Sequence, residues 1–223
     1  MRKTVICLAN SRKTSGRCYA GKEFSEGKVG EWCRPVSDTD THEIAAADYR
    51  YEDHSEAMLF DVIRFRHLGA AKHTAQRENV LNDREYYWVK EGTSDLPLES
   101  FLDEPQSLWV NNYSSYYGLN DRVQETLIEE PIQSLYFIYV ENPTVHVRIE
   151  GAEFDNPKKR VRIAFDYNSV DYLLSITDVV QESYYLNLDE GKYLLEGGVY
   201  LTISLGESYG GYYYKLAAAV IRE

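Results

Sequence analysis

Cysteine, proline and long apolar runs are all scarce in this 223-residue chain. Its three cysteines, Cys7, Cys18 and Cys33, form no C-x-x-C pair and have no nearby histidine to complete a zinc tetrahedron. No stretch approaches the ~20 apolar residues of a membrane-spanning helix. The first residues contain only one short apolar run, Val5 to Ala9, whereas a secretory signal needs about 7 to 15 such residues. We therefore expect reduced thiols, no metal and a cytoplasmic protein without a membrane partner.

Positive charge is also in deficit, because 24 Lys and Arg face 36 Asp and Glu, for a net charge of −12. This excludes a protein that coats nucleic acid with its whole surface, which requires clustered cations. The first 37 residues differ from the rest, with eight basic and three acidic side chains. They could form one basic groove on an acidic body. Alternatively, they are spread over different faces of several strands.

The length is sufficient for one large core or two of about 100 residues each, and 43% of the residues are hydrophobic. Short runs rich in Val, Ile, Tyr and Phe alternate with turn-forming residues, as in antiparallel sheets. In one run, Val145, Val147 and Ile149 are predicted to face the core, and the alternate residues solvent. Strands are predicted at residues 4–9, 17–24, 32–36, 58–67, 86–90, 134–141, 145–150, 160–166, 171–177, 199–205 and 212–221.

Helical signals are few and short, at residues 97–103 and at 120–128, where Asn120 is the predicted N-cap. Alternating βαβ units are absent from the pattern, which excludes Rossmann and P-loop architectures. A change from long polar connections to short turns near residues 128–133 predicts two domains, 1–130 and 131–223. Each has five or six strands, the number and size typical of an OB-type barrel. The predicted fold is mainly β, with two OB-like antiparallel barrels.

Four segments of the sequence suggest a family. The segments CLANSRKTSGRCYAGKEF, GEWCRPVS, KHTAQREN and VYLTISLGESYGGYYYKLAAAVI together resemble the dual OB-containing domain family of bacteria, often written DuOB. The resemblance covers almost the whole chain and is most specific at residues 7–37 and 200–221. It implies two OB-like folds and a nucleic-acid or nucleotide-binding role within bacterial conflict systems. It implies no catalytic residues.

A polar segment between the first two predicted strands is a candidate phosphate-binding loop. Backbone amides, hydroxyls and Arg forks all donate to anionic oxygens, although the segment lacks the Walker A spacing. A solvated hairpin is the alternative for these residues. The candidate ligands are Asn10, Ser11, Arg12, Lys13 and Arg17.

Trp32 and Arg34 are two positions apart in a predicted strand, so their side chains share a face. An aromatic ring beside a guanidinium suits stacking on a base and pairing with a phosphate, as in OB folds that bind single strands. The alternative is that Trp32 fills the core of the first barrel while Arg34 caps a carbonyl. Lys158 and Arg160 belong to a second basic cluster and could extend a positive surface, or could be an ordinary charged turn.

Tyrosine is abundant, with 20 residues, several of them adjacent, as at Tyr86 and Tyr87. Most are interpreted as cross-strand pairs on half-exposed sheets. The hairpin containing Tyr209 and Tyr212 is the predicted exception, because its glycines would let a stacking partner approach the backbone.

His73, Gln76, Glu78 and Asn79 form a polar cluster that we interpret as a hydrogen-bond network fixing a loop. Acid–base chemistry by His73 and Glu78, converging with Arg12 or Lys13, is the enzymatic alternative and would indicate a phosphodiesterase or RNase. The sequence itself predicts no catalytic residue and no cofactor. It favours a non-catalytic module that binds single-stranded nucleic acid or a nucleotide. The rival hypothesis is a protein-interaction scaffold that uses the acidic, Tyr-rich surface.

Overall fold

The computed structural model describes residues 1–13, 16–39, 41–45 and 48–222. The chain divides into two compact units: unit 1 comprises Met1–Leu102 and Glu129–Leu135, and unit 2 comprises Asp103–Ile128 and Tyr136–Glu223. The chain therefore enters unit 2, returns briefly to unit 1, and enters unit 2 again. The predicted division into domains 1–130 and 131–223 stays a prediction.

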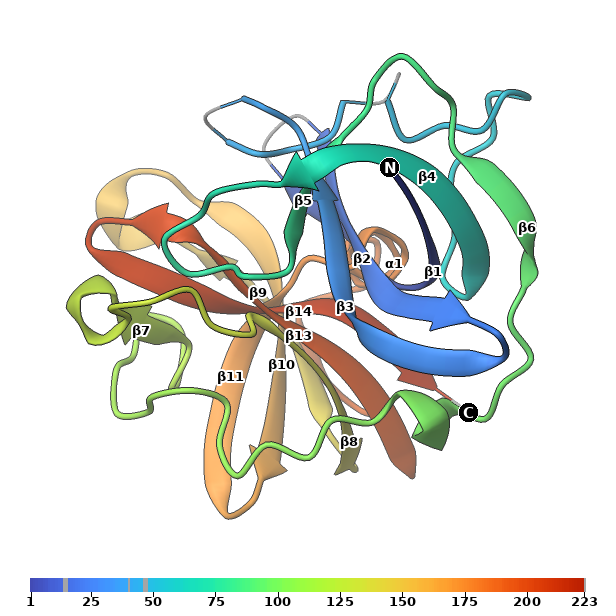
Figure 1. Ribbon diagram of the computed structural model, residues 1–223. Coiled ribbons are helices and arrows are strands. Elements are labelled where there is room, and N and C mark those ends of the chain that lie inside the picture. Colours follow the sequence, from blue (N-terminus) through green and yellow to red (C-terminus); the bar gives the residue numbers. More distant parts are fainter. Residues whose placement is uncertain (14–15, 40, 46–47, 223) are drawn as a thin grey trace. The chain divides into compact units, whose positions relative to one another are not determined.

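Unit 1 is a closed five-stranded β-barrel with one additional strand (Figure 1). Hydrogen bonding follows the order β1-β2-β3-β5-β4, and β4 pairs with β1 to close the ring. The sixth strand, β6, pairs with residues 61–64 of β4, whereas residues 67–70 of β4 pair with β5. The strands are β1 (Arg2–Lys13), β2 (Gly16–Ser25), β3 (Lys28–Val36), β4 (Asp61–Ala70), β5 (Asn79–Asn82) and β6 (Val89–Thr93), followed by a 3-10 turn, η1 (Leu98–Phe101).

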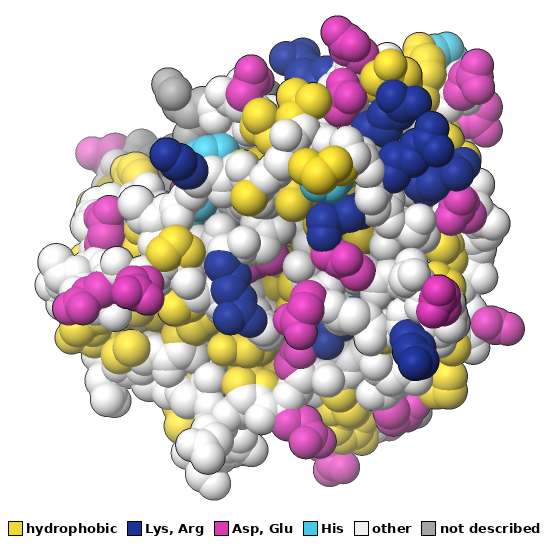
Figure 2. Space-filling view, viewed as in Figure 1, with side chains coloured by type: hydrophobic (Ala, Val, Ile, Leu, Met, Phe, Trp, Pro, Cys, Tyr) yellow, Lys and Arg dark blue, Asp and Glu magenta, His cyan; other side chains and the backbone are white. Residues whose placement is uncertain are grey.

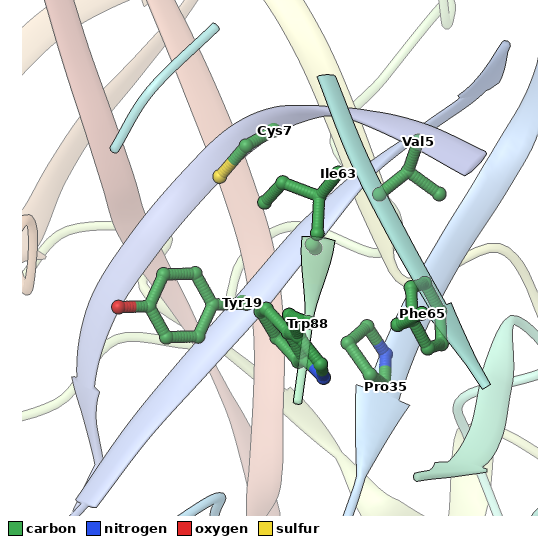
Figure 3. A pocket seen from close by; sticks show the side chains of 8 residues that line it. Val5, Cys7, Tyr19, Pro35, Ile63, Phe65 and Trp88 are labelled. Atoms are coloured by element: carbon green, nitrogen blue, oxygen red, sulfur yellow. The ribbon is translucent and has the colours of Figure 1, made fainter. Parts of the chain in front are cut away.

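Aromatic and β-branched side chains fill the interior of this barrel (Figure 3). Tyr19 packs against Tyr49 and Trp88, with ring centroids 5.1 and 5.3 Å apart. The indole nitrogen of Trp88 donates to Asn82 Oδ1 at 3.0 Å, which satisfies its one buried donor. The void that remains between these side chains measures only about 10 Å³, about the space of one water molecule. The described interior of the barrel is thus a packed core.

Unit 2 contains an eight-stranded sheet whose strand order corresponds to that of unit 1. Its strands β9, β10, β11, β14 and β13 follow one another as β1, β2, β3, β5 and β4 do in unit 1. Its path is β12-β9-β10-β11-β14-β13-β8, with β7 pairing to β14 and a parallel pairing between β11 and β14. The two strands β8 and β9 are separated only by Asn142 and Pro143. The chain itself therefore links β8, which pairs with β13, to β9, which pairs with β10, as two halves of one interrupted strand.

The elements of unit 2 have a core of their own, centred on Val145, Val147, Val161 and Ile163. They are β7 (Arg122–Gln124), η2 (Glu125–Leu127), β8 (Leu135–Glu141), β9 (Thr144–Glu150), η3 (Ala152–Phe154), β10 (Lys158–Tyr167), β11 (Val170–Ile176), α1 (Val179–Leu186), β12 (Gly191–Leu194), β13 (Gly198–Tyr209) and β14 (Tyr212–Arg222). Both units confirm the predicted mainly β fold of two OB-like barrels.

The predicted helix at residues 120–128 is wrong. Asn120 has a φ of 49° and does not cap a helix; its side chain accepts from Asn112 N at 2.7 Å and donates to Asp171 O at 2.9 Å. Residues 122–124 instead form β7, paired with β14. Long-range hydrogen bonds therefore override the local helix signal. The predicted helix at 97–103 is reduced to the single 3-10 turn η1.

The predicted alternation in β9 holds for Val145 and Val147 but fails at its end. Ile149 is 51% exposed, whereas Glu150 is 6% exposed. Glu150 is buried because Arg162 donates two hydrogen bonds to it, at 2.7 and 3.0 Å. An ion pair thus replaces apolar packing at this position.

Four elements have no counterpart among the predicted segments, namely β5, β12, α1 and the 3-10 turn η3. The strand predicted at 86–90 occurs at β6 instead. The helix α1 begins after Asp178, whose Oδ1 accepts from the amides of Val180 and Gln181 at 3.0 Å each. This is a standard N-cap arrangement. In the described part of the chain, no helix has the length and apolar character that crossing a membrane requires.

Candidate nucleic-acid interface

Three arginines and two tyrosines line an open cleft on the outside of unit 1. The cleft has a volume of about 210 Å³, and the described residues that line it include no acidic side chain. Arg2 lies directly opposite Arg66 in the β1–β4 pairing, and Thr4 lies opposite Arg64. Since alternate residues of a strand share a face, these three arginines project from the same side of the barrel. Figure 2 shows Lys and Arg side chains gathered over β4 and the start of β1. We call this site, lined by Arg2, Arg64, Phe65, Arg66, Tyr86, Tyr87 and Val89, the arginine–tyrosine cleft.

The two tyrosines of the cleft precede β6, and both remain open to solvent. Tyr86 is 44% exposed and Tyr87 is 52% exposed. The guanidinium of Arg66 lies over the ring of Tyr86, 3.7 Å from its centroid, a cation–π contact that orients both groups. Arg64 is held by Glu91, with Nε and Oε1 3.1 Å apart. Arg2 has no ion-pair partner among the described residues, so at least one cation of the cleft is uncompensated.

The predicted phosphate loop forms the hairpin between β1 and β2, at the end of β1 opposite Arg2. Arg12 is exposed and lies directly opposite Arg17, while Lys13 is half-buried. Thr14 and Ser15 lie outside the described residues. Two of the predicted ligands serve the fold instead: the Ser11 side chain is buried, and Asn10 donates to Ala57 O at 3.2 Å. Arg2 and Arg12 lie at opposite ends of β1, and a single groove formed by the basic residues of the first 37 positions stays a prediction.

The predicted stacking platform of Trp32 and Arg34 is wrong, because both side chains are buried. Trp32 is 5% exposed and Arg34 is 1% exposed. Cys33 faces the barrel interior, so Trp32 and Arg34 do share the opposite face, as predicted. The guanidinium of Arg34, however, pairs with Glu78, with Nη2 and Oε1 3.3 Å apart. Stacking on a base would require an exposed ring, which Trp32 lacks.

The polar cluster of His73, Gln76, Glu78 and Asn79 forms hydrogen bonds in the β4–β5 connection. His73 Nδ1 accepts from the amides of Ala75 and Gln76 at 2.9 and 3.0 Å. The side chain of Asn79 donates to Gln76 Oε1 at 2.9 Å. Glu78 accepts from both the amide and the hydroxyl of Ser134.

The bonds from Ser134 to Glu78 join residues 129–135 to the rest of unit 1. Ile132 also forms a β-bridge with Gln76. His73 and Glu78 are thus engaged with different partners, and their geometry gives the proposed acid–base pair no support.

The remaining predicted residues lie in unit 2. Lys158 and Arg160 are exposed on β10. Tyr209, at the β13–β14 hairpin, is 77% exposed. Tyr212 lies directly opposite Tyr209 and is half-buried under Arg122, whose guanidinium is 3.9 Å from the ring centroid. Tyr212 therefore has one face occupied, and Tyr209 is the more accessible ring.

Sequence reasoning singled out none of the residues of the arginine–tyrosine cleft as site residues. A signal for Arg64 and Arg66 was present in the β4 sequence VIRFRHL, in which two arginines flank a core phenylalanine at the spacing of one strand face. The pairing of β4 with the start of β1 brings Arg2 beside them, across more than 60 positions of sequence. A single sequence contains no direct indication of that pairing.

A family model for the dual OB-containing domain matches residues 3–220. No curated protein and no solved structure matches this chain. The family match spans nearly the full length and agrees with the two OB-like strand orders described above. The chain therefore belongs to the dual OB-containing domain family.

Proposed function

We propose that unit 1 binds single-stranded nucleic acid or a nucleotide at the arginine–tyrosine cleft. The observation that carries the proposal is the convergence of Arg2, Arg64 and Arg66 with two exposed tyrosines around one cleft. Guanidinium groups pair with phosphate oxygens in bidentate geometry. Exposed aromatic rings stack on bases with little dependence on sequence. An anionic ligand with a flat aromatic portion satisfies both halves of the cleft.

Each side chain has a distinct role in this proposal. Arg2 and Arg66 contact phosphate, since Glu91 compensates part of the charge of Arg64. Tyr87 stacks on a base because it is the more exposed ring, whereas Tyr86 has one face covered by Arg66. An accessory role in a bacterial conflict system, which the family resemblance implies, stays a prediction.

Fluorescence anisotropy of labelled single-stranded DNA and RNA at several salt concentrations tests the proposal. The Arg2→Ala/Arg66→Ala variant should bind more weakly, and the slope of log K against log salt should fall by about 1.4, or about 0.7 per phosphate contact on a single strand. Tyr87→Ala should lose about 1–3 kcal/mol, the usual contribution of one stacked base. Circular dichroism establishes that each variant is folded.

The matched control is Lys28→Ala/Arg50→Ala, which removes the same charge from unit 1 outside the cleft. Its affinity should stay close to that of the unmodified protein. Equal losses in the control and the cleft variant would show that only net charge matters and would overturn the proposal. Absence of binding even at low salt would favour the rival hypothesis of a protein-interaction scaffold.

A further inference from the structure

Unit 2 has a row of cations on the face of its sheet that points away from the core. In the pairing of β9 with β10, Arg148 lies directly opposite Arg160, and Glu150 opposite Lys158. In the pairing of β12 with β9, Lys192 lies opposite His146. Directly opposed residues project to the same side of a sheet, as do residues two apart. We call the set His146, Arg148, Lys158, Arg160 and Lys192 the basic strip.

The opposite face of the same strands belongs to the core. Val147 and Val161 are opposed in the register, are 1% and 3% exposed, and belong to the core cluster. The basic strip therefore cannot turn inward. Lys158, Arg160 and Lys192 are exposed, and the side chain of Arg148 retains 37% of its accessible surface.

The acidic groups Glu150 and Asp121 lie against Arg148 and Arg162 of these strands. Glu150 accepts hydrogen bonds from Arg148 and Arg162, and Asp121 lies 3.6 Å from Arg162. Lys158, Arg160 and Lys192 have no ion-pair partner among the described residues. Burial, followed by the nearby charges of Lys192 and Arg148, lowers the pKa of His146. The strip thus has a local positive potential within an acidic chain.

Exposed aromatic rings border the basic strip. Tyr116 is 70% exposed and Phe154 is 63% exposed, and their ring centroids are 5.5 Å apart. Tyr117 joins them to the strip: its ring centroid is 4.8 Å from that of Tyr116, and its carbonyl accepts from Arg148 Nη2 at 2.6 Å. Its hydroxyl also accepts from the amide of Gly151 at 2.7 Å. The rings are therefore fixed beside the cations.

We infer that the basic strip, with Tyr116 and Phe154 at its border, is a second binding site for single-stranded nucleic acid. Lys158, Arg160 and Lys192 contact successive phosphates, and the two exposed rings stack on bases. An acidic peptide would engage the cations but has no flat base to place on these rings, so the aromatic border favours a nucleic acid. The inference rests on the proposed function for its ligand class, whereas the site lies wholly within unit 2.

Anisotropy of a labelled single-stranded oligonucleotide on the full chain tests the inference. The strip variant is Lys158→Ala/Arg160→Ala/Lys192→Ala, and the border variant is Tyr116→Ala/Phe154→Ala. Each is made in the unmodified protein and in the Arg2→Ala/Arg66→Ala background. Within that background, each should weaken the residual binding by about fivefold or more. The control Lys28→Ala/Arg50→Ala/Lys72→Ala, with three exposed or part-exposed cations of unit 1 removed, should change it less than about twofold.

The outcomes separate the two sites. If the strip and border variants bind like the control in both backgrounds while the cleft variant loses affinity, the inference is overturned and the proposed function stands. If only the strip and border variants lose affinity, the inference stands and the cleft proposal fails. If poly-glutamate binds in a strip-dependent manner and oligonucleotides do not, the surface docks acidic protein and the inference is overturned.

Discussion

Replacing Glu78 by alanine should severely destabilise unit 1. Its carboxylate lies 3.3 Å from Arg34 Nη2, and the two side chains are 3% and 1% exposed. The substitution leaves the guanidinium buried without that carboxylate and removes both hydrogen bonds from Ser134. Breaking a buried ion pair from one side typically costs about 3–5 kcal/mol. In a chain of this size, that corresponds to a fall in melting temperature of roughly 6–20 °C.

Urea denaturation, followed by tryptophan fluorescence, measures this loss. Glu85→Ala is the matched control, since it removes an exposed carboxylate from the same unit, and it should change the free energy of unfolding by less than about 0.5 kcal/mol. The double variant Arg34→Met/Glu78→Leu removes both charges and should recover much of the loss. A loss below about 1 kcal/mol for Glu78→Ala would refute the reasoning, because it would mean that the pair is hydrated rather than buried.

Three further predictions concern buried polar groups. Tyr19 is 2% exposed, and its hydroxyl has no hydrogen-bond partner among the described residues. Tyr19→Phe should therefore raise the free energy of unfolding, measured in urea, by about 1 kcal/mol. A clear loss of stability would contradict this prediction. The Asp178 carboxylate accepts hydrogen bonds from two α1 amides and from Val220 N. Asp178→Ala should therefore lower the free energy of unfolding by about 2–3 kcal/mol in the same assay. The control Glu182→Ala should lower it far less. Burial lowers the pKa of Lys215 to about 7, against about 10.4 in an unfolded chain. Between these two pKa values the unfolded state binds more protons than the folded state, so the free energy of unfolding should rise from about pH 7 to 9. Lys215→Met should abolish that rise. An identical rise in the variant would show that Lys215 is not the titrating group.

The alternation of apolar and polar residues was sufficient to predict most strands. Val145 and Val147, for example, face the core as their spacing indicates. The pattern failed where a polar side chain is buried with a specific partner, as at Glu150. Such a partner, here Arg162, is fixed by the register of β9 with β10, which periodicity does not contain.

Helix prediction failed in two ways for a related reason: the helix predicted at residues 120–128 does not form, and the helix α1 was not predicted. Residues 120–128 have a good local N-cap, yet Asn120 is held by bonds to Asn112 and to Asp171. The sequence of α1 has a genuine N-cap in Asp178, but its short run of residues, including two tyrosines, also fits a strand. Tertiary contacts decide between these alternatives.

The sequence predicted a basic, aromatic surface but not the residues that form the proposed site. That prediction came from the basic character of the N-terminal segment and the abundance of tyrosine. Which cations converge depends on barrel closure, which places Arg2 beside Arg66 and leaves Arg34 paired with Glu78. The degree of burial then decides which rings are accessible: Tyr87 is exposed, whereas Trp32 is buried.

Photo-crosslinking of a single-stranded oligonucleotide to the full chain, with mapping of the modified peptides, tests the central claim most directly. We predict crosslinks in the peptide containing Tyr86 and Tyr87, lost in Tyr87→Ala and diminished in Arg2→Ala/Arg66→Ala. Crosslinks to the peptide containing Trp32, with none at Tyr86 and Tyr87, would contradict the account, because they would place the ligand on residues that the structure buries.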